Sequence, residues 1–73
     1  MISYTPLWKT LIDKKKKKID LVREAGINGK TINDMAHNDG DRFVSLKTIS
    51  KICEYLECNI EDVVEYKQEE NNE

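Results

Sequence analysis

The sequence predicts an all-α fold, a compact five-helix domain over residues 1–66, with a helix-turn-helix formed by its second and third helices. Apolar residues recur three and four positions apart along most of the chain, which is the spacing of one helix face. A length of 73 residues suffices for one small domain but not for two. The stretch from Leu21 to Met35 places a glycine between two such apolar patterns, as in two helices joined by a tight turn.

The glycine turn is the centre of this motif. Gly26 suits a turn because glycine adopts a positive φ without a steric clash. Asn28 is a good N-cap for the following helix, since its side-chain oxygen can accept a hydrogen bond from a free backbone N–H. That third helix is predicted from Gly29 to Ala36 or His37. Its outward face carries small and polar residues: Gly29, Lys30, Thr31, Asn33 and Asp34.

Gly29 has two interpretations. A glycine near the start of a helix costs up to about 1 kcal/mol relative to alanine. It either allows the backbone to approach a nucleic acid closely, or it forms a turn dipeptide with Asn28, so that the helix starts one residue later.

The first helix is predicted from Pro6 to about Asp13, after an extended lead-in. We expect Thr5 to be its N-cap, with Pro6 at the first helical position, where the missing N–H costs nothing. Trp8 is expected either to anchor the edge of the core or to lie in a dimer interface. The apolar face of this helix consists of Leu7, Trp8, Leu11 and Ile12.

A run of five lysines, Lys14 to Lys18, precedes the second helix, which is predicted from about Lys17 to Glu24. The run is either a solvated linker or a phosphate-binding segment. Cations at a helix N-terminus oppose the macrodipole by about 0.3–1 kcal/mol each, and no Ser, Thr, Asn or Asp cap is evident, so the run does not serve local stability. Lys17 and Lys18 are therefore expected to contact a phosphate backbone, whereas Lys14 and Lys15 could satisfy the end of the first helix.

A loop and a fourth helix follow the motif. Residues 38–44 are rich in turn formers and predict a loop, from which Phe43 or Val44 returns to cover the core. Ser45 is a strong N-cap for a helix over residues 46–57.

A short fifth helix is predicted over residues 60–64, with Asn59 as its cap. Residues 67–73 contain no apolar side chain and are expected to form a flexible acidic tail. The inward positions of the last two helices are predicted to be Leu46, Ile49, Ile52, Cys53, Leu56, Ile60, Val63 and Val64.

Charge is polarised along the chain. The formal net charge of −2 taken alone argues against a nucleic-acid ligand. Residues 1–30, however, hold eight basic and three acidic side chains, a net charge of +5, and residues 31–73 hold four basic and eleven acidic ones, a net charge of −7. Such polarisation can present a basic face to a polyanion while the acidic remainder keeps the protein in solution.

Several classes of protein are disfavoured. No apolar run approaches the roughly 20 residues of a membrane span, and no signal-peptide pattern is present, so a cytoplasmic location is expected. Cys53 and Cys58 flank a probable helix end that a disulfide would distort, so both are expected to be reduced. His37 is the only histidine, and neither a zinc spacing nor a catalytic constellation is evident. We expect no metal, no cofactor and no enzymatic activity.

In its motif and in the order of its helices, the chain resembles the Xre family of lambda-repressor/Cro-type helix-turn-helix regulators over about residues 5–66. It looks most like the short single-domain members. The matching positions are Leu21, Ala25, Gly26, Ile27, Thr31 and Ile32 in the motif, and Ser45, Leu46, Ile49, Ile52, Leu56, Val63 and Val64 in the second half. The resemblance implies a lambda-repressor-like fold and a transcriptional regulator that binds double-stranded DNA. Its third helix would enter the major groove, and a homodimer would read a palindromic operator.

Candidate DNA contacts follow from this resemblance and from the charges. Phosphate contacts are expected from Lys17, Lys18, Asn28 and Arg42. Base contacts are expected from Lys30, Thr31, Asn33 and Asp34.

The chain departs from the family at three places. Lys18 stands where the family often has a glutamine that orients the third helix. The loop over residues 38–44 is about two residues longer than usual and is acidic. Asp34 stands where a basic residue is frequent, and it would repel a phosphate but could read a cytosine amino group.

A protein-interaction module is the alternative function. The same fold can serve as an antitoxin-like or anti-repressor partner that holds another protein through an acidic surface, and the overall acidity, Asp34 and the acidic loop favour this. The dimer surface is open in either case, with Trp8 and Tyr4, or Tyr55 and Tyr66, as candidates.

Overall fold

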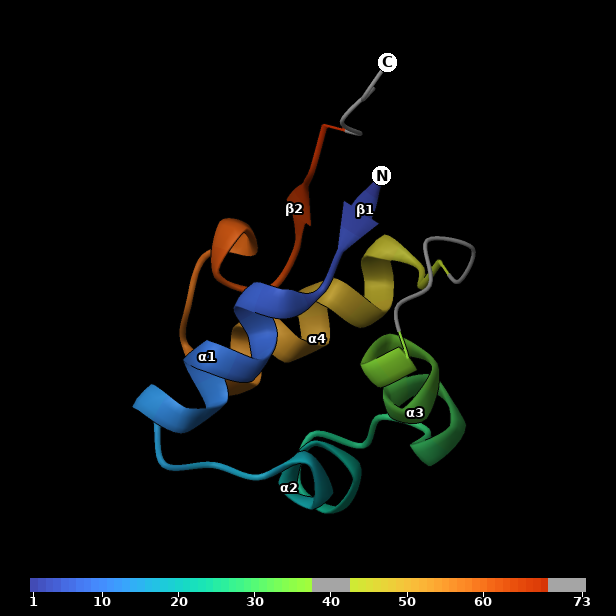
Figure 1. Ribbon diagram of the computed structural model, residues 1–73. Helices are drawn as coiled ribbons and strands as arrows, with labels where there is room; N and C mark the ends of the chain where they lie inside the picture. The colour runs from blue at the N-terminus through green and yellow to red at the C-terminus, as the bar shows by residue number, and fades with distance from the viewer. Residues whose placement is uncertain (38–42, 69–73) are drawn as a thin grey trace.

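The computed structural model describes residues 1–37 and 43–68, and over these it contains four α-helices, one 3₁₀ turn and a two-stranded ribbon. Figure 1 shows α2 at one end of the molecule and the ribbon at the other. In chain order the elements are β1 (Ile2–Ser3), α1 (Thr5–Asp13), α2 (Lys18–Arg23), α3 (Gly29–His37), α4 (Leu46–Leu56), η1 (Ile60–Asp62) and β2 (Glu65–Tyr66).

The fold is mostly helical rather than wholly so, and the prediction of a fifth α-helix is not confirmed. The segment expected to form it makes only the single 3₁₀ turn η1, in which the Val63 N–H donates to the Ile60 carbonyl at 2.9 Å. Two residues further on, the chain is already extended, because Glu65 pairs with Ser3 and Tyr66 with Ile2 in an antiparallel ribbon. This pairing leaves room for one turn and no more.

The ribbon joins the two ends of the described chain. Its pairing continues past the strands, since the Lys67 N–H donates to the Met1 carbonyl at 2.7 Å and the N-terminal ammonium donates to the Lys67 carbonyl at 2.6 Å. Lys67 begins the predicted tail, of which residues 69–73 lie outside the described residues.

The helix caps differ from expectation in two places. Thr5 is already the first residue of α1, and its N–H donates to the Ser3 hydroxyl at 3.2 Å, so the prediction of Thr5 as N-cap is wrong. At α2 the Asp20 carboxylate accepts a hydrogen bond from the Lys17 N–H at 2.8 Å. An acidic side chain in the first turn therefore replaces the missing Ser or Thr cap. Ser45 caps α4 as predicted, accepting from Thr48.

Backbone bonds close the end of α1. The Lys16 N–H donates to the Leu11 carbonyl at 2.8 Å, and the Lys15 N–H donates to the Ile12 carbonyl at 3.0 Å. Lys15 has φ of 59°, so the three lysines after the helix form a Schellman motif with a lysine in the left-handed position. The main chain of this segment thus satisfies the helix end, and its side chains remain available for other contacts.

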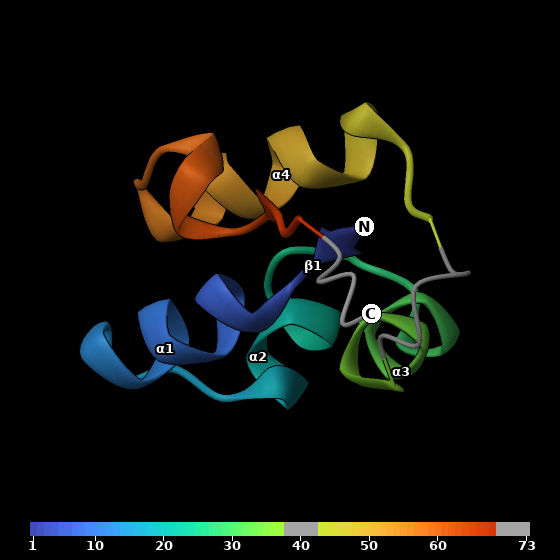
Figure 2. The ribbon, with the colours of Figure 1, turned by 45° about the horizontal axis from the view of Figure 1, so that its top comes forward.

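The core lies between α1, α2, α3, α4 and η1 (Figure 2). Tyr4 is only 2% exposed, and its hydroxyl accepts a hydrogen bond from the Val44 N–H at 3.2 Å, which ties the chain before α4 to the start of α1. Burial removes Tyr4 from the candidates for a dimer surface. The buried apolar residues are Tyr4, Leu7, Leu11, Leu21, Ile27, Ile32, Met35, Ile49, Ile52, Leu56 and Val63.

Two residues predicted to point inward lie on the surface. Leu46 is 75% exposed because it is the first residue of α4, where the helix extends beyond the elements that it covers. Ile60 is 49% exposed, since the 3₁₀ turn rotates it away from the position that an α-helix would give it. Of the two residues expected to return to the core before α4, Val44 packs against it and Phe43 is exposed.

The two motif glycines should respond oppositely to alanine. Gly26 has φ of +75°, so Gly26→Ala is expected to destabilise the fold by about 1–2 kcal/mol through a clash with the adjacent backbone, although no atom beyond its chain neighbours lies within 4 Å of the new methyl group. Gly29 lies in α3 with open space around its Cα, so Gly29→Ala is expected to stabilise the fold by up to about 1 kcal/mol. Thermal unfolding followed by circular dichroism measures both, and an equal effect of the two substitutions would contradict the assigned turn.

Candidate nucleic-acid interface

The turn between α2 and α3 has the predicted geometry. Gly26 is left-handed, and the Ile27 N–H donates to the Leu21 carbonyl at 3.0 Å, which closes α2. The Asn28 side-chain oxygen then accepts a hydrogen bond from the Lys30 N–H at 2.8 Å and caps α3. Both capping bonds are made by the motif's own residues, so the turn is closed by local interactions. The Asn28 side-chain oxygen accepts this internal bond, and its amide NH₂ remains as a donor for a ligand.

The side chains of the lysines at the start of α2 extend in different directions. Lys17 is exposed at the N-cap position. The Lys18 ammonium lies 5.1 Å from the centre of the Trp8 ring, in a cation–π contact. Trp8 is half-buried against the core, so the ring serves as a fixed platform beneath the lysine. This contact shows a role for Trp8 that the sequence did not suggest.

The Lys16 side chain extends towards α4, whereas that of Lys18 extends towards Trp8 on α1. Its ammonium lies 5.3 Å from the centre of the Tyr55 ring and 3.9 Å from the Glu24 carboxylate, to which the Tyr55 hydroxyl donates a hydrogen bond. The Tyr55 hydroxyl raises the pKa of Lys16, and the bond to Glu24 raises the pKa of Tyr55. At neutral pH Lys16 is therefore a cation with an internal partner, unlike Lys17.

The outer face of α3 carries an ion pair between two residues of the same helix. The Lys30 ammonium lies 3.6 Å from the Asp34 carboxylate, one helical turn away. The pair is on the surface, so it adds little to stability, but it offsets the positive charge that Lys30 brings to this face. Asn33 is exposed beside the pair, whereas Thr31 is half-buried.

His37, which the sequence offers only as a metal ligand or catalytic group, lies on the same face of α3. His37 follows Asn33 by four residues and Lys30 by seven, and this helical spacing already predicts that the three side chains share one face of α3. The ring Nδ1 lies 2.8 Å from the Asn33 carbonyl oxygen. Because a carbonyl only accepts, Nδ1 carries the proton, and Nε2 is the atom left for an outside partner.

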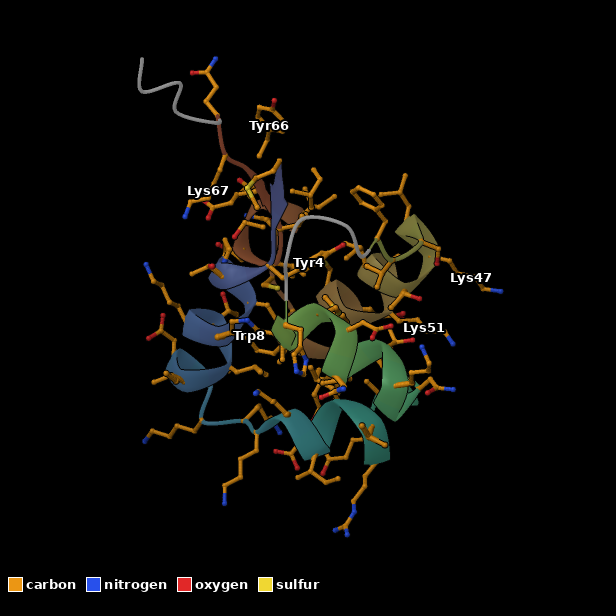
Figure 3. All side chains as sticks on the ribbon, turned by 45° about the vertical axis from the view of Figure 1, so that its right-hand side comes forward. Tyr4, Trp8, Lys47, Lys51, Tyr66 and Lys67 are labelled. Carbon is orange, nitrogen blue, oxygen red and sulfur yellow. The ribbon has the colours of Figure 1, made fainter. Side chains whose placement is uncertain are left out.

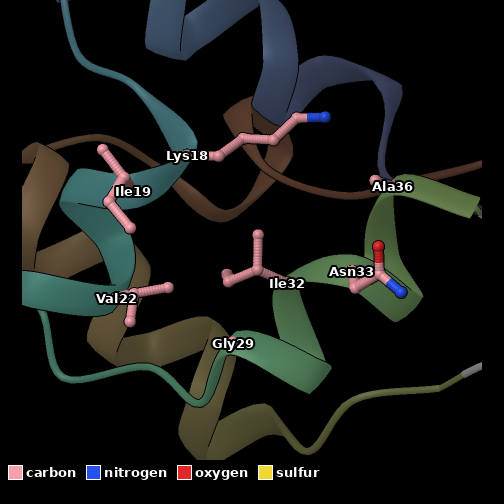
Figure 4. Close-up of a pocket in the computed structure, with 7 residues that line it drawn as sticks. All are labelled: Lys18, Ile19, Val22, Gly29, Ile32, Asn33 and Ala36. Carbon is pink, nitrogen blue, oxygen red and sulfur yellow. The ribbon is translucent and has the colours of Figure 1, made fainter.

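A groove separates α2 from α3 on this side of the molecule, with a volume of about 370 Å³ (Figure 4). In Figure 4 Ile19 and Val22 face Asn33 and Ala36 across it, and Lys18 extends along one side. Ile19 is 46% exposed, and no role for this apolar residue is evident from the sequence. The lining residues are Lys18, Ile19, Val22, Gly29, Ile32, Asn33 and Ala36.

The structure thus brings some of the predicted site residues together and not others. Lys18 and Asn33 line one groove, and Lys30 and Asp34 form an ion pair. Arg42 lies outside the described residues, as do the acidic side chains of the preceding loop.

Other kinds of site find little support in residues 1–37 and 43–68. Cys53 and Cys58 are free thiols, and burial raises the pKa of Cys58 to about 11, which keeps it protonated at neutral pH. No group of three His, Cys, Asp or Glu side chains in this part of the chain could hold a metal ion. Among the same residues, no helix has both the length and the apolar character to cross a membrane.

Comparisons with known proteins agree with this geometry. The family model for Cro/C1-type helix-turn-helix DNA-binding domains matches residues 6–69. A crystal structure of the transcriptional regulator VanUg (Form II) superimposes with a TM-score of 0.78 at 39% sequence identity, covering 88% of this chain and 81% of that one. None of the curated proteins matches this chain.

Proposed function

Because this chain belongs to the Cro/C1-type helix-turn-helix DNA-binding family, we propose that it is a transcriptional regulator that binds double-stranded DNA through α2 and α3. The observation that carries the proposal is the groove lined by both helices. It joins Lys18, at the start of α2, to Asn33, on the polar face of α3. A cation beside a polar helix face matches the arrangement of DNA, in which phosphates border the base edges of the major groove.

Phosphate contacts are proposed from the entrance of the motif: Lys17, Lys18 and Asn28, with Arg42 as a fourth. Lys17 and Lys18 are exposed at the N-terminus of α2. The amide NH₂ of Asn28 can donate to a phosphate while its oxygen caps α3.

Base contacts are proposed from α3. The exposed amide of Asn33 suits adenine, and Lys30 suits guanine. Asp34 can accept from a cytosine amino group. Thr31 is half-buried, so only the exposed part of its side chain is proposed to contact a base.

A homodimer on a palindromic operator is the proposed active form. A single domain of this size makes few phosphate contacts, and specific binding at physiological salt needs more of them. Two copies related by a two-fold axis would read two half-sites one helical turn apart.

Fluorescence anisotropy with random-sequence duplex at low salt tests the DNA proposal. Binding that weakens linearly on a log–log plot of affinity against salt concentration supports it. Selection of bound duplexes from a random pool then gives the operator, and a palindrome among the selected sequences supports the dimer.

Two observations favour the alternative of a protein-interaction module. The Lys30–Asp34 pair offsets charge on α3, and Phe43 and Leu46 expose apolar surface before and at the start of α4. A pull-down from the native host separates the two functions. A stable protein complex without any duplex binding would replace the DNA proposal.

Asp34→Asn is expected to strengthen duplex binding. The substitution removes the carboxylate 3.6 Å from the Lys30 ammonium, so that this cation becomes available to DNA. Affinity for random duplex should rise and the salt slope should steepen by about one, since on a duplex without its guanine the released Lys30 can contact a phosphate instead. Asp13→Asn, which makes the same charge change at the exposed end of α1, is the control and should leave the slope unchanged. Equal effects of the two variants would show that only net charge matters.

A further inference from the structure

The groove between α2 and α3 is apolar where the proposed DNA-binding face is otherwise polar. Its walls come from the side chains of Ile19, Val22, Ile32 and Ala36. Almost half of Ile19 is exposed to solvent, so this apolar surface is open to a ligand and does not merely complete the core. An apolar groove within a DNA-reading face needs an apolar partner on the DNA.

Base pairs offer one apolar group in the major groove, the 5-methyl group of thymine. Apart from C–H edges, which do not project as the methyl group does, the other major-groove groups are hydrogen-bond donors or acceptors, which would lose their water against Ile19 and Val22 without gaining a partner. The methyl group projects from the outer edge of the base, on the side of its own strand's phosphates. A site for it should therefore have a phosphate-binding cation at its rim.

The groove has that cation. Lys18 extends along one side of it, as Figure 4 shows, and the Trp8 ring 5.1 Å from its ammonium holds the side chain there. Asn33 lines the same groove and carries the amide that suits adenine. We propose that this groove binds the methyl group of a thymine, with Lys18 on a neighbouring phosphate and Asn33 on an adjacent base.

Small residues keep the groove open. Outside its chain neighbours and its own helix backbone, Gly29 has no atom within 4 Å of the position that a Cβ would occupy, and Ala36 contributes only a methyl group to the wall. Ile19 and Ala36 are then specificity-determining residues. The inference rests on the proposed DNA binding, and it adds that each half-site contains a thymine at a fixed position.

Replacing thymines by deoxyuridine, one at a time, in a duplex selected from the random pool tests the inference. Deoxyuridine lacks only the methyl group, so base pairing and charge stay the same. We expect one position in each half-site at which the substitution weakens binding about fourfold, the effect of burying one methyl-sized group. Other positions should show no such loss.

Variants of the groove show where the methyl group binds. Ile19→Ala should bind the thymine and deoxyuridine duplexes equally at that position, whereas Ile12→Ala, an equal truncation of a 75% exposed residue on α1, should keep the fourfold difference. Ala36→Leu fills the groove and should prefer deoxyuridine. Circular dichroism confirms that the variants are folded.

Three outcomes would overturn the inference. Salt-dependent duplex binding that no deoxyuridine substitution weakens would refute the thymine site and leave the proposed function standing. A thymine preference that persists in Ile19→Ala and Ala36→Leu would place the methyl site elsewhere. Self-association in the absence of DNA that Ile19→Ala abolishes would assign the groove to a second copy of the chain. Failure to bind any duplex would instead refute the proposed function.

Discussion

Duplex binding should be abolished by the double substitution Lys17→Glu/Lys18→Glu. Two proposed phosphate contacts are lost and two repulsive ones are gained, so affinity for any duplex should fall by at least about a hundredfold at moderate salt. Whatever binding remains should have a salt slope smaller by about two. Fluorescence anisotropy across a salt series measures both quantities.

The loss of binding should not come from unfolding. Glutamates at the N-terminus of α2 interact favourably with the helix dipole, each by about 0.3–1 kcal/mol, where the native lysines oppose it. Removal of the Lys18–Trp8 contact costs about 0.5–1 kcal/mol in the other direction. The gain from two substitutions at the helix dipole is at least as large as this one loss, so the circular dichroism spectrum should stay helical and the melting temperature should not fall below that of the native protein.

A matched control changes the same amount of charge elsewhere. Lys47 and Lys67 are exposed, and Figure 3 shows them extending from α4 and from the chain end, away from α2. Lys47→Glu/Lys67→Glu should reduce affinity only slightly. If the two double variants bind equally, or if the first keeps full affinity with a flat salt dependence, α2 is not the phosphate-binding element.

Leu21→Ala should have the second large effect, on folding. Leu21 is fully buried at the centre of α2, and its carbonyl accepts the bond that closes the turn. Truncation of a buried leucine costs about 2–5 kcal/mol. A chain of this length has a total stability of about 4–11 kcal/mol, so the truncation should remove a large share of it, and duplex binding at 37 °C should fall in proportion to the folded fraction.

Urea denaturation measures this effect, and Ile12→Ala is again the comparison. Ile12 is mostly exposed, so its truncation should change the free energy of unfolding by less than about 0.5 kcal/mol. Equal losses for the two variants would mean that the core is not packed around Leu21.

Local signals explain which elements were predictable from the sequence. Gly26, Asn28 and Ser45 act on neighbours within a few residues, through a left-handed φ or a side-chain cap, and each was predicted correctly. The Asp20 cap is equally local, but it comes from within the first turn of α2 and not from the residue before the helix, where a capping side chain is expected. Such interactions depend on chain neighbours and not on the rest of the fold.

Contacts between distant residues explain what was missed. The β1–β2 ribbon joins segments more than 60 positions apart, and it is this pairing that limits the expected fifth helix to one turn. Leu46 repeats the apolar spacing of α4, yet it is exposed, because burial depends on which elements lie opposite and not on spacing alone.

The helix-turn-helix and its caps were therefore readable from residue order, since their energetics involve neighbours within one or two turns. The direction of each lysine was not, because Trp8 and Tyr55, on other helices, select where Lys18 and Lys16 point. The groove likewise exists only once α2 packs beside α3, since neither helix alone encloses a volume. The family could be inferred from the pattern, while the surface proposed to read DNA required the packing.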